Sequence, residues 1–172
     1  LSIFGRSVFV VEAGPRDAAL ASGDVVQLVQ VIDGDTLRVR KDDGGGATVR
    51  LLGVKAFDAK TAKNDMAEAD RAAEEGLRLL ADGQALRVLL NNPPRDRHGR
   101  TLANLYVGDD DLGLTLVSRG HALVYTVYPF AQLQAYRQAQ AGARAARLGL
   151  WADPTAAERA DALAREWSRA AP

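Results

Sequence analysis

Cysteine is absent from the 172 residues of this chain. Its absence excludes disulfides, thiolate metal sites and a cysteine nucleophile. An excess of charge is absent as well: 22 Lys and Arg residues balance 22 Asp and Glu residues, so a site for a polyanion must be a local patch. No apolar run approaches the roughly 20 residues that span a bilayer, and we therefore expect no membrane span. The hydrophobic content of 47% suffices for one well-buried core, which predicts a single domain with extensions.

Composition divides the chain into three parts. Residues 1–23 begin with an apolar piece and then become rich in Gly, Pro and Ala, which is typical of an N-terminal extension or arm. Residues 24–152 hold the regular patterns of a folded domain, and residues 153–172 form an alanine-rich stretch that predicts a helical extension. The chain starts at Leu1 without a methionine, so we expect that an upstream piece was removed and favour a secreted or cell-envelope protein.

Five segments have the short, apolar and β-branched pattern of strands. They are VVQLVQVI (25–32), TLRVRK (36–41), TVRLLGV (48–54), ALRVLL (85–90) and TLANLYV (101–107). The turn-forming sequences DGDT and DDGGGA join the first three strands, which predicts a meander. The polar sequence NNPPRDRHGR separates the last two strands and is predicted to be a loop.

Helical segments follow the strands. The period of apolar residues predicts helices over 61–82 and 130–148, a short helix in LGLTLVSRG and a final helix from Pro154 onward, while HALVYTVY predicts one more short strand. Five principal strands with helices around them predict an α+β fold that is mostly β. We expect a closed five-stranded barrel of the oligonucleotide-binding (OB) type, with three packed helices and an appended C-terminal helix.

Three charged residues near the first strands are candidates for a site. Asp33 and Asp35 stand in the turn DGDT, where aspartate is favoured for local hydrogen bonding alone. Two carboxylates one residue apart also suit calcium or magnesium. Arg50 lies inside an apolar strand, where a charge is costly unless it is paired or faces a pocket. We therefore expect a partnered or functional role for Arg50.

A second charge cluster occupies residues 95–100, and a cluster of this kind is usually a solvated loop. Gly99 permits a close turn, and the guanidinium of Arg100 beside the next strand can grip a phosphate bidentately. Arg97 is a further candidate contact for a substrate, whereas His98 is assigned no catalytic role. His121, Tyr125 and Tyr128 pack in a strand or, if exposed beside this basic loop, stack on bases.

Five motifs occur in a specific order along the chain: VIDGDTLRV, VRLLGV, DRHGRTLANLYV, LVSRGHALVY and ARLGLW. Together they resemble the staphylococcal-nuclease-like, or thermonuclease, family from about Asp24 to Trp151. The resemblance implies an OB barrel with helices and a calcium-dependent phosphodiesterase that acts on DNA or RNA. Nucleic acid is therefore the expected partner, and we expect the chain to act as a monomer.

The resemblance also implies roles for individual residues. Asp35 matches the first calcium-binding aspartate of the family, and Asp33 is the other, weaker acid of the same turn. Arg50 and Arg100 match two arginines that contact the phosphate, and both are assigned as catalytic. A metal ion and two guanidiniums would stabilise the negative charge that a phosphodiester gains in the transition state, while a carboxylate positions or deprotonates the attacking water.

The sequence departs from the family's pattern in GVKAFD, residues 53–58, where the family has a run like Gly-Val-Asp-Ala-Pro-Glu. Lys55 stands at the position of the second calcium-ligand aspartate. Asp58 stands at the position of the glutamate that acts as general base, with a side chain one methylene shorter. An ammonium repels calcium, so calcium binding is expected to be weak or lost. Lys55, Arg97 and Tyr128 are then the candidate substrate contacts.

Three interpretations follow from these residues. In the first, the protein is a nuclease that hydrolyses phosphodiester bonds with altered or weakened metal dependence, and Lys55 supplies part of the positive charge. In the second, it is a catalytically impaired OB-fold module that binds nucleic acid, with an affinity that falls with salt. In the third, the barrel is a scaffold for protein contacts.

Overall fold

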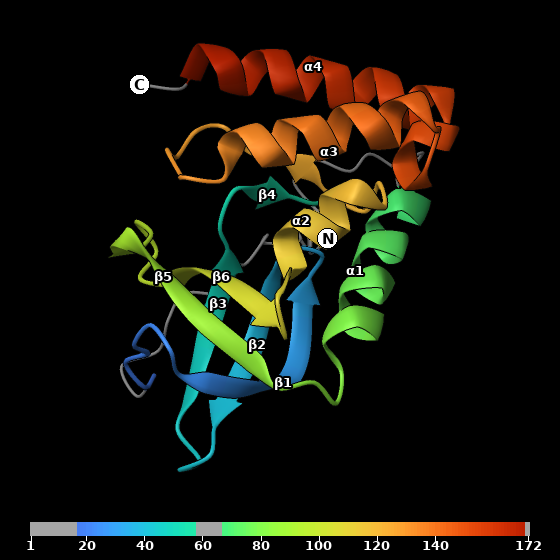
Figure 1. The fold of residues 1–172 in the computed structure, drawn as a ribbon. Helices are drawn as coiled ribbons and strands as arrows, with labels where there is room; N and C mark the ends of the chain where they lie inside the picture. Colours follow the sequence, from blue (N-terminus) through green and yellow to red (C-terminus); the bar gives the residue numbers. More distant parts are fainter. Residues whose placement is uncertain (1–16, 58–66, 171–172) are drawn as a thin grey trace, which may run out of the picture.

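The computed structural model describes residues 17–57 and 67–170, which form a β-barrel with helices gathered at one end and along one side (Figure 1). The strands are β1 Val25–Asp33, β2 Thr36–Lys41, β3 Gly46–Leu51, β4 Val54–Lys55, β5 Leu86–Arg95, β6 Thr101–Val107, β7 Asp110–Asp111 and β8 Leu123–Val124. The helices are α1 Ala67–Ala81, α2 Leu112–Ser118, α3 Leu133–Ala145 and α4 Pro154–Ala170, with the 3₁₀ helix η2 at Gly149–Ala152.

The barrel forms from a sheet in the order β3-β2-β1-β5-β6-β7, in which neighbouring strands are antiparallel. It closes through a parallel pairing of β3 with β6, where Val49 stands opposite Thr101. Strand β1 pairs with both of its neighbours in the sheet. Its first two residues pair with β5, and from Val26 onward it pairs with β2 through two register shifts that allow the strand to bend. The predicted five-stranded OB barrel is thereby confirmed.

The main core fills the barrel and the space under α1 and α2. Many of its fully buried side chains come from alternate positions of the strands, as expected for residues that face one side of a pleated sheet. They include Leu37, Val39, Val49, Leu86 and Leu105. Helix α1 contributes Ala73, Leu77 and Ala81, spaced four residues apart on one face. Burial of each large side chain contributes about 1.5–3 kcal/mol.

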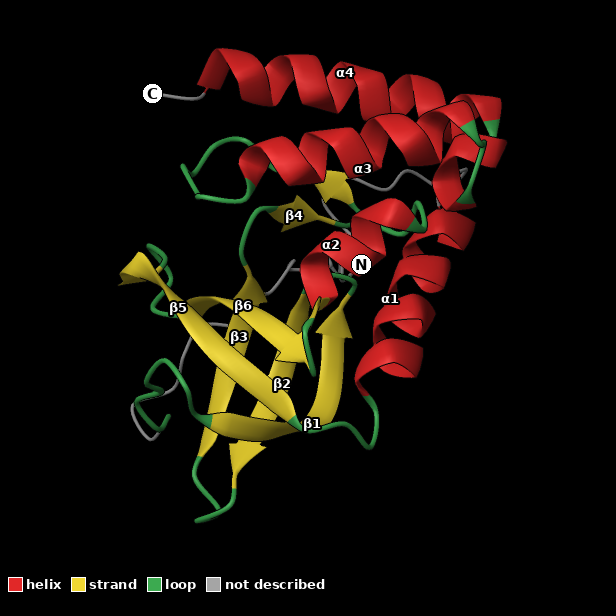
Figure 2. Ribbon diagram, viewed as in Figure 1, coloured by secondary structure: helices red, strands yellow, loops and turns green. Residues whose placement is uncertain are grey.

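A second cluster of buried residues holds α4 against the rest of the molecule. Along α4, residues Ala156, Ala160, Leu163 and Trp167 recur with helical spacing and are buried. They pack with Phe57, Leu123, Ala143 and Trp151, among others. An ion pair between Arg144 Nη2 and Asp161 Oδ2, at 2.8 Å, joins α3 to α4. Figure 2 shows these two helices stacked above the short strand β4.

The structure shortens or shifts several predicted elements. The strand expected over residues 121–128 is only Leu123–Val124. One further backbone hydrogen bond, from Tyr125 to the carbonyl oxygen of Gly53, extends its pairing with β4 before the chain turns away. The helix expected over 130–148 is α3, which stops before Arg147, a residue with the positive φ of 55°. Strand β5 continues to Arg95, so the predicted loop is reduced to residues 96–100.

Two further predictions concern the helices. The helix expected over 61–82 is α1, of which residues 67–81 are helical, and residues 61–66 lie outside the described part of the chain. It ends before Gly83, which adopts a φ of 71° as expected at a helix C-terminus. Within the described residues, none of the helices combines the length and the apolar character that crossing a membrane requires.

Candidate active site

Asp35 lies at the centre of the site, in the tight turn that joins β1 to β2. The turn packs closely, since a Cβ added at Gly34 would meet Ala56 Cβ at 2.5 Å and Ala73 Cβ at 2.6 Å. The Asp35 side chain is buried beside this turn and is only 1% exposed. Its Oδ1 accepts a hydrogen bond from Thr36 Oγ1 at 2.9 Å, and its Oδ2 accepts one from the backbone N–H of Ala56 at 2.9 Å.

Two cations compensate the buried charge of Asp35. The Nε of Arg50, in β3, lies 3.5 Å from Asp35 Oδ1, and the Nζ of Lys55, in β4, lies 3.9 Å from Asp35 Oδ2. Arg50 is itself buried, and its Nη1 donates to the carbonyl oxygen of Leu51. The expectation that Arg50 has a partner is confirmed. A carboxylate between two cations is stable in the interior because each charge has a nearby counter-charge.

The two aspartates of the turn differ in protonation. Burial disfavours the charged form of Asp35, but the positive charges of Arg50 and Lys55 outweigh it and hold the pKa of Asp35 below its ordinary value. Asp33 lacks these two close contacts. Burial, followed by the negative charge of Asp35, raises the pKa of Asp33 to about 8. This raised pKa favours the form of Asp33 that keeps its proton near neutral pH.

This proton makes folding stability depend on pH in a defined direction. The pKa of Asp33 is near 3.8 in an unfolded chain and about 8 in the folded protein. Between these values the folded state binds a proton that the unfolded state lacks, so stability falls as pH rises. We expect the free energy of unfolding to decrease by up to about 1.4 kcal/mol per pH unit through this group.

Urea unfolding of the wild type and of Asp33→Asn at several pH values between about 5 and 8 checks this slope. Asparagine keeps a donor toward Asp35 but does not titrate, so the slope should be clearly smaller in the variant. Asp35 contributes no slope in this window, because its pKa lies below the window. If the free energy of unfolding changed equally with pH in the wild type and in Asp33→Asn, Asp33 would already be ionised at neutral pH.

The loop 96–100 is built around the carboxylate of Asp96. Its Oδ1 accepts the backbone N–H groups of His98 at 2.9 Å and Arg100 at 3.0 Å, and its Oδ2 accepts Arg100 Nε at 2.7 Å. Gly99, with a φ of 78°, allows the chain to turn back into β6. Asp96 thus holds the Arg100 guanidinium in place through Nε. The other two nitrogens of the guanidinium can donate hydrogen bonds to a phosphate.

Aromatic rings form the opposite wall of the site. Tyr125 and Tyr128 follow β8 and are half-buried, with ring centroids 6.1 Å apart. The backbone N–H of Tyr125 donates to the carbonyl oxygen of Gly53 at 2.8 Å, and β8 pairs with β4, so Leu123 stands opposite Lys55. The Cζ of Arg50 lies 5.7 Å from the centroid of the Tyr125 ring. The aromatic wall is therefore attached directly to the strand that carries Lys55.

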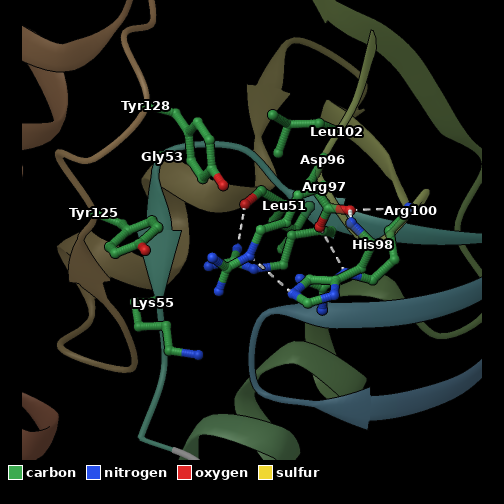
Figure 3. Close-up of a pocket in the computed structure, with 11 residues that line it drawn as sticks. Leu51, Gly53, Lys55, Asp96, Arg97, His98, Arg100, Leu102, Tyr125 and Tyr128 are labelled. Carbon is green, nitrogen blue, oxygen red and sulfur yellow. Dashed lines mark hydrogen bonds and ion pairs between the residues drawn. The ribbon is translucent and has the colours of Figure 1, made fainter. Parts of the chain in front are cut away.

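These elements enclose one pocket of about 230 Å³ (Figure 3). Figure 3 shows Lys55, Tyr125 and Tyr128 on one side of it and Arg97, His98 and Arg100 on the other. Among the described lining residues, the cationic side chains are those of Arg50, Lys55, Arg97 and Arg100, and the carboxylate is that of Asp96. A pocket with this excess of positive charge and two aromatic rings suits a phosphate group with an attached base.

Among the residues that the structure describes, which do not include Asp58, the donors beneath the pocket do not make up a calcium site. Calcium takes about six to eight oxygen ligands, preferably carboxylates. Here both oxygens of Asp35 accept hydrogen bonds and face cations. In residues 17–57 and 67–170, no group of three or more His, Cys, Asp or Glu side chains is arranged to hold a metal. The Lys55 ammonium stands beside the oxygen that a cation would need.

The model of the family described as Staphylococcal nuclease homologue matches residues 48–153, which is more than half of the chain. The chain belongs to the staphylococcal nuclease family. The match begins in β3 and ends immediately before α4, so it includes Arg50, Lys55, the loop 96–100 and both tyrosines of the pocket. The family expected from the five motifs is confirmed.

Individual relatives support the same assignment. A protein named Thermonuclease from Staphylococcus intermedius is 29% identical over 130 residues, which cover 75% of this chain and 77% of the relative. The Thermonuclease of Staphylococcus hyicus is 26% identical over 149 residues, covering 84% and 88%. An uncharacterized endonuclease of Haemophilus influenzae is 31% identical over 130 residues, covering 74% and 66%. The similarity thus extends over most of the chain.

The structure gathers most of the candidate residues of this nuclease family member. Arg50, Lys55, Arg97, Arg100 and Tyr128 line the pocket, and Asp35 lies beneath it. The catalytic candidate Asp58 lies outside the described residues. Asp96 is assigned no role in the sequence analysis. An aspartate three residues before a glycine nevertheless indicates a turn of the kind that Asp96 stabilises here. The sequence also leaves open whether Tyr125 packs in a strand, and the structure places its ring in the pocket wall.

Proposed function

We propose that this protein binds the phosphodiester backbone of DNA or RNA in the cationic pocket and hydrolyses it. The single observation that carries the proposal is the convergence of four cationic side chains from β3, β4 and the loop 96–100 on one pocket. Membership of a nuclease family supplies the reaction class. The aromatic wall supplies flat surfaces on which a base next to the bound phosphate can stack.

The pocket suits the charge changes of hydrolysis. As water attacks the phosphorus, negative charge grows on the phosphoryl oxygens, and preorganised cations lower the barrier because they need no rearrangement. Arg50 is held by Asp35 and Leu51, and Arg100 is held by Asp96. Lys55 adds a third fixed cation. Asp58 remains the candidate base that accepts the proton of the attacking water.

Lys55 favours a particular form of this function, in which phosphate binding does not need calcium. Its ammonium lies 3.9 Å from Asp35 Oδ2 and supplies positive charge beside the pocket. A point charge on lysine is an effective phosphate contact. We therefore expect phosphate affinity to be the same with a chelator as with calcium.

Digestion of single-stranded DNA, duplex DNA and RNA, each with and without calcium, tests the proposal. Arg100→Ala removes one fixed cation and is expected to lower the cleavage rate by about a hundredfold or more. Arg87→Ala is a matched control, because Arg87 is an exposed arginine that stacks on Tyr106 outside the pocket. Equal cleavage by Arg100→Ala and the wild type would remove the pocket from the reaction.

A second candidate function is nucleic-acid binding without hydrolysis. The observation that favours it is the pairing of Asp35 with Arg50 and Lys55, which leaves this carboxylate engaged by protein groups. In the digestion assay this function gives no cleavage of any substrate but salt-sensitive binding by the wild type, which Arg100→Ala weakens. Absence of both cleavage and binding would leave the barrel as a scaffold for protein contacts.

A further inference from the structure

Helix α4 follows the segment that matches the family model, which ends at residue 153. Nevertheless, α4 contacts Tyr125, a residue of the pocket wall, through the side chain of Trp167. Trp167, near the C-terminal end of the helix, is only 8% exposed, and its ring meets that of Tyr125 edge to face, with centroids 5.0 Å apart and planes at 88°. Edge-to-face pairs of this geometry attract each other in addition to burying apolar area.

Tyr125 links this helix to the cations of the pocket. Its ring touches Trp167 on one side and the ring of Tyr128 on another, while the Arg50 guanidinium lies 5.7 Å from its centroid. Its backbone is tied to Gly53, next to β4. Tyr125 is only half-buried, and its ring takes its orientation from the groups packed against it, which include members of the second cluster. Trp167 is the largest of the buried α4 side chains that can fix this orientation.

We propose that Trp167 is a positioning residue for the pocket: it holds the Tyr125 ring, and through that ring the Arg50 guanidinium, in the orientation that receives nucleic acid. Helix α4 is then a working part of the binding site and not only a cover for the second hydrophobic cluster. This inference rests on the proposed function, because it names a residue that shapes the same site.

A simpler role for Trp167 is to bury apolar area, and the other α4 residues supply a control for it. Leu163 belongs to the same cluster and is 4% exposed. Leu163→Ala should lower stability through the cavity that it leaves. It should leave the Tyr125 ring in place. Trp167→Leu removes the aromatic contact, and Trp167→Phe retains an aromatic ring that can restore it in part.

The experiment measures the affinity of each variant for a dye-labelled single-stranded oligonucleotide, at a temperature where unfolding curves show that all are folded. We expect Trp167→Leu to weaken binding about tenfold, Trp167→Phe to recover most of the loss, and Leu163→Ala to bind as the wild type does. Tyr125→Leu should weaken binding similarly, and its combination with Trp167→Leu should cost little more, since both act through one ring. Additive losses, or equal binding by Trp167→Leu and the wild type, would overturn the inference.

A second readout needs no nucleic acid and separates this inference from the proposed function. In NMR spectra of the free protein, the Arg50 Nε–H resonance reports the position of the Tyr125 ring. We expect it to shift in Trp167→Leu and in Tyr125→Leu, and to stay in place in Leu163→Ala. An unshifted resonance in Trp167→Leu contradicts the positioning role. If the wild type binds no nucleic acid but the resonance shifts in Trp167→Leu, only the proposed function is refuted.

Discussion

Replacing Lys55 by aspartate is expected to weaken calcium-free binding of single-stranded DNA by about a hundredfold and to create a response to calcium. The ammonium lies 3.9 Å from Asp35 Oδ2 and lines the pocket. Its exchange for a carboxylate changes the local charge by two units, which reverses the attraction for a phosphate. The same exchange places a third carboxyl group beside Asp33 and Asp35, and calcium affinity rises with the number of carboxylates.

Two measurements check this prediction. Affinity for a labelled oligonucleotide in a chelator gives the loss of binding, and thermal unfolding with and without calcium gives the gain of a cation site, because a ligand that binds only the folded state stabilises it. Lys41→Asp is the matched control: Lys41 pairs with Asp24 at 3.6 Å and lies outside the pocket. The account is wrong if Lys55→Asp behaves like Lys41→Asp, or if calcium stabilises the wild type.

Replacing Arg50 by alanine is expected to lower both stability and binding. Arg50 is the closest cation to the buried carboxylate of Asp35. Removal of one partner from a buried ion pair costs about 3–5 kcal/mol because the other charge is left uncompensated. Lys55 still faces Asp35, so we expect a loss near the lower end of this range. Phosphate binding should fall as well, since the guanidinium lines the pocket.

A double variant separates the two effects. In Arg50→Ala with Asp35→Asn, the unpaired charge is gone, so the free energy of unfolding measured in urea should recover in part, whereas binding should not. Arg38→Ala is a control for the loss of an arginine that pairs with an aspartate, Asp17, away from the pocket. Recovery of nucleic-acid binding in the double variant would show that Arg50 acts only by neutralising Asp35.

The sequence allowed the barrel and the cationic side of the pocket to be predicted. Strand patterns and turn residues are local signals, and the barrel follows from them. Arg50 was identified because a charge inside an apolar strand needs a partner, and the structure shows that partner to be Asp35. Arg100 was identified from its place beside Gly99 at the start of a strand, and the structure puts it in the same pocket.

Other features depend on contacts that no local pattern records. The proton on Asp33 follows from its burial beside Asp35, and the sequence shows only that the two acids are near each other. Tyr125 was expected in a strand or against a base, because β-rich composition does not show where pairing stops. The contact between Tyr125, which follows β8, and Trp167 of α4 joins residues that are distant in the sequence. Packing of this kind decides side-chain orientation only in the folded chain.

Salt titration of single-stranded DNA binding by the wild-type protein, in a chelator and again with calcium, tests the central claim most directly. The claim is that fixed side-chain cations, Lys55 among them, hold the phosphodiester in place of a metal. It predicts that the logarithm of the affinity falls linearly with the logarithm of the salt concentration. The slope is about −0.7 for each phosphate contact, and the line is the same in both buffers. Binding that requires calcium, or that ignores salt, would contradict it.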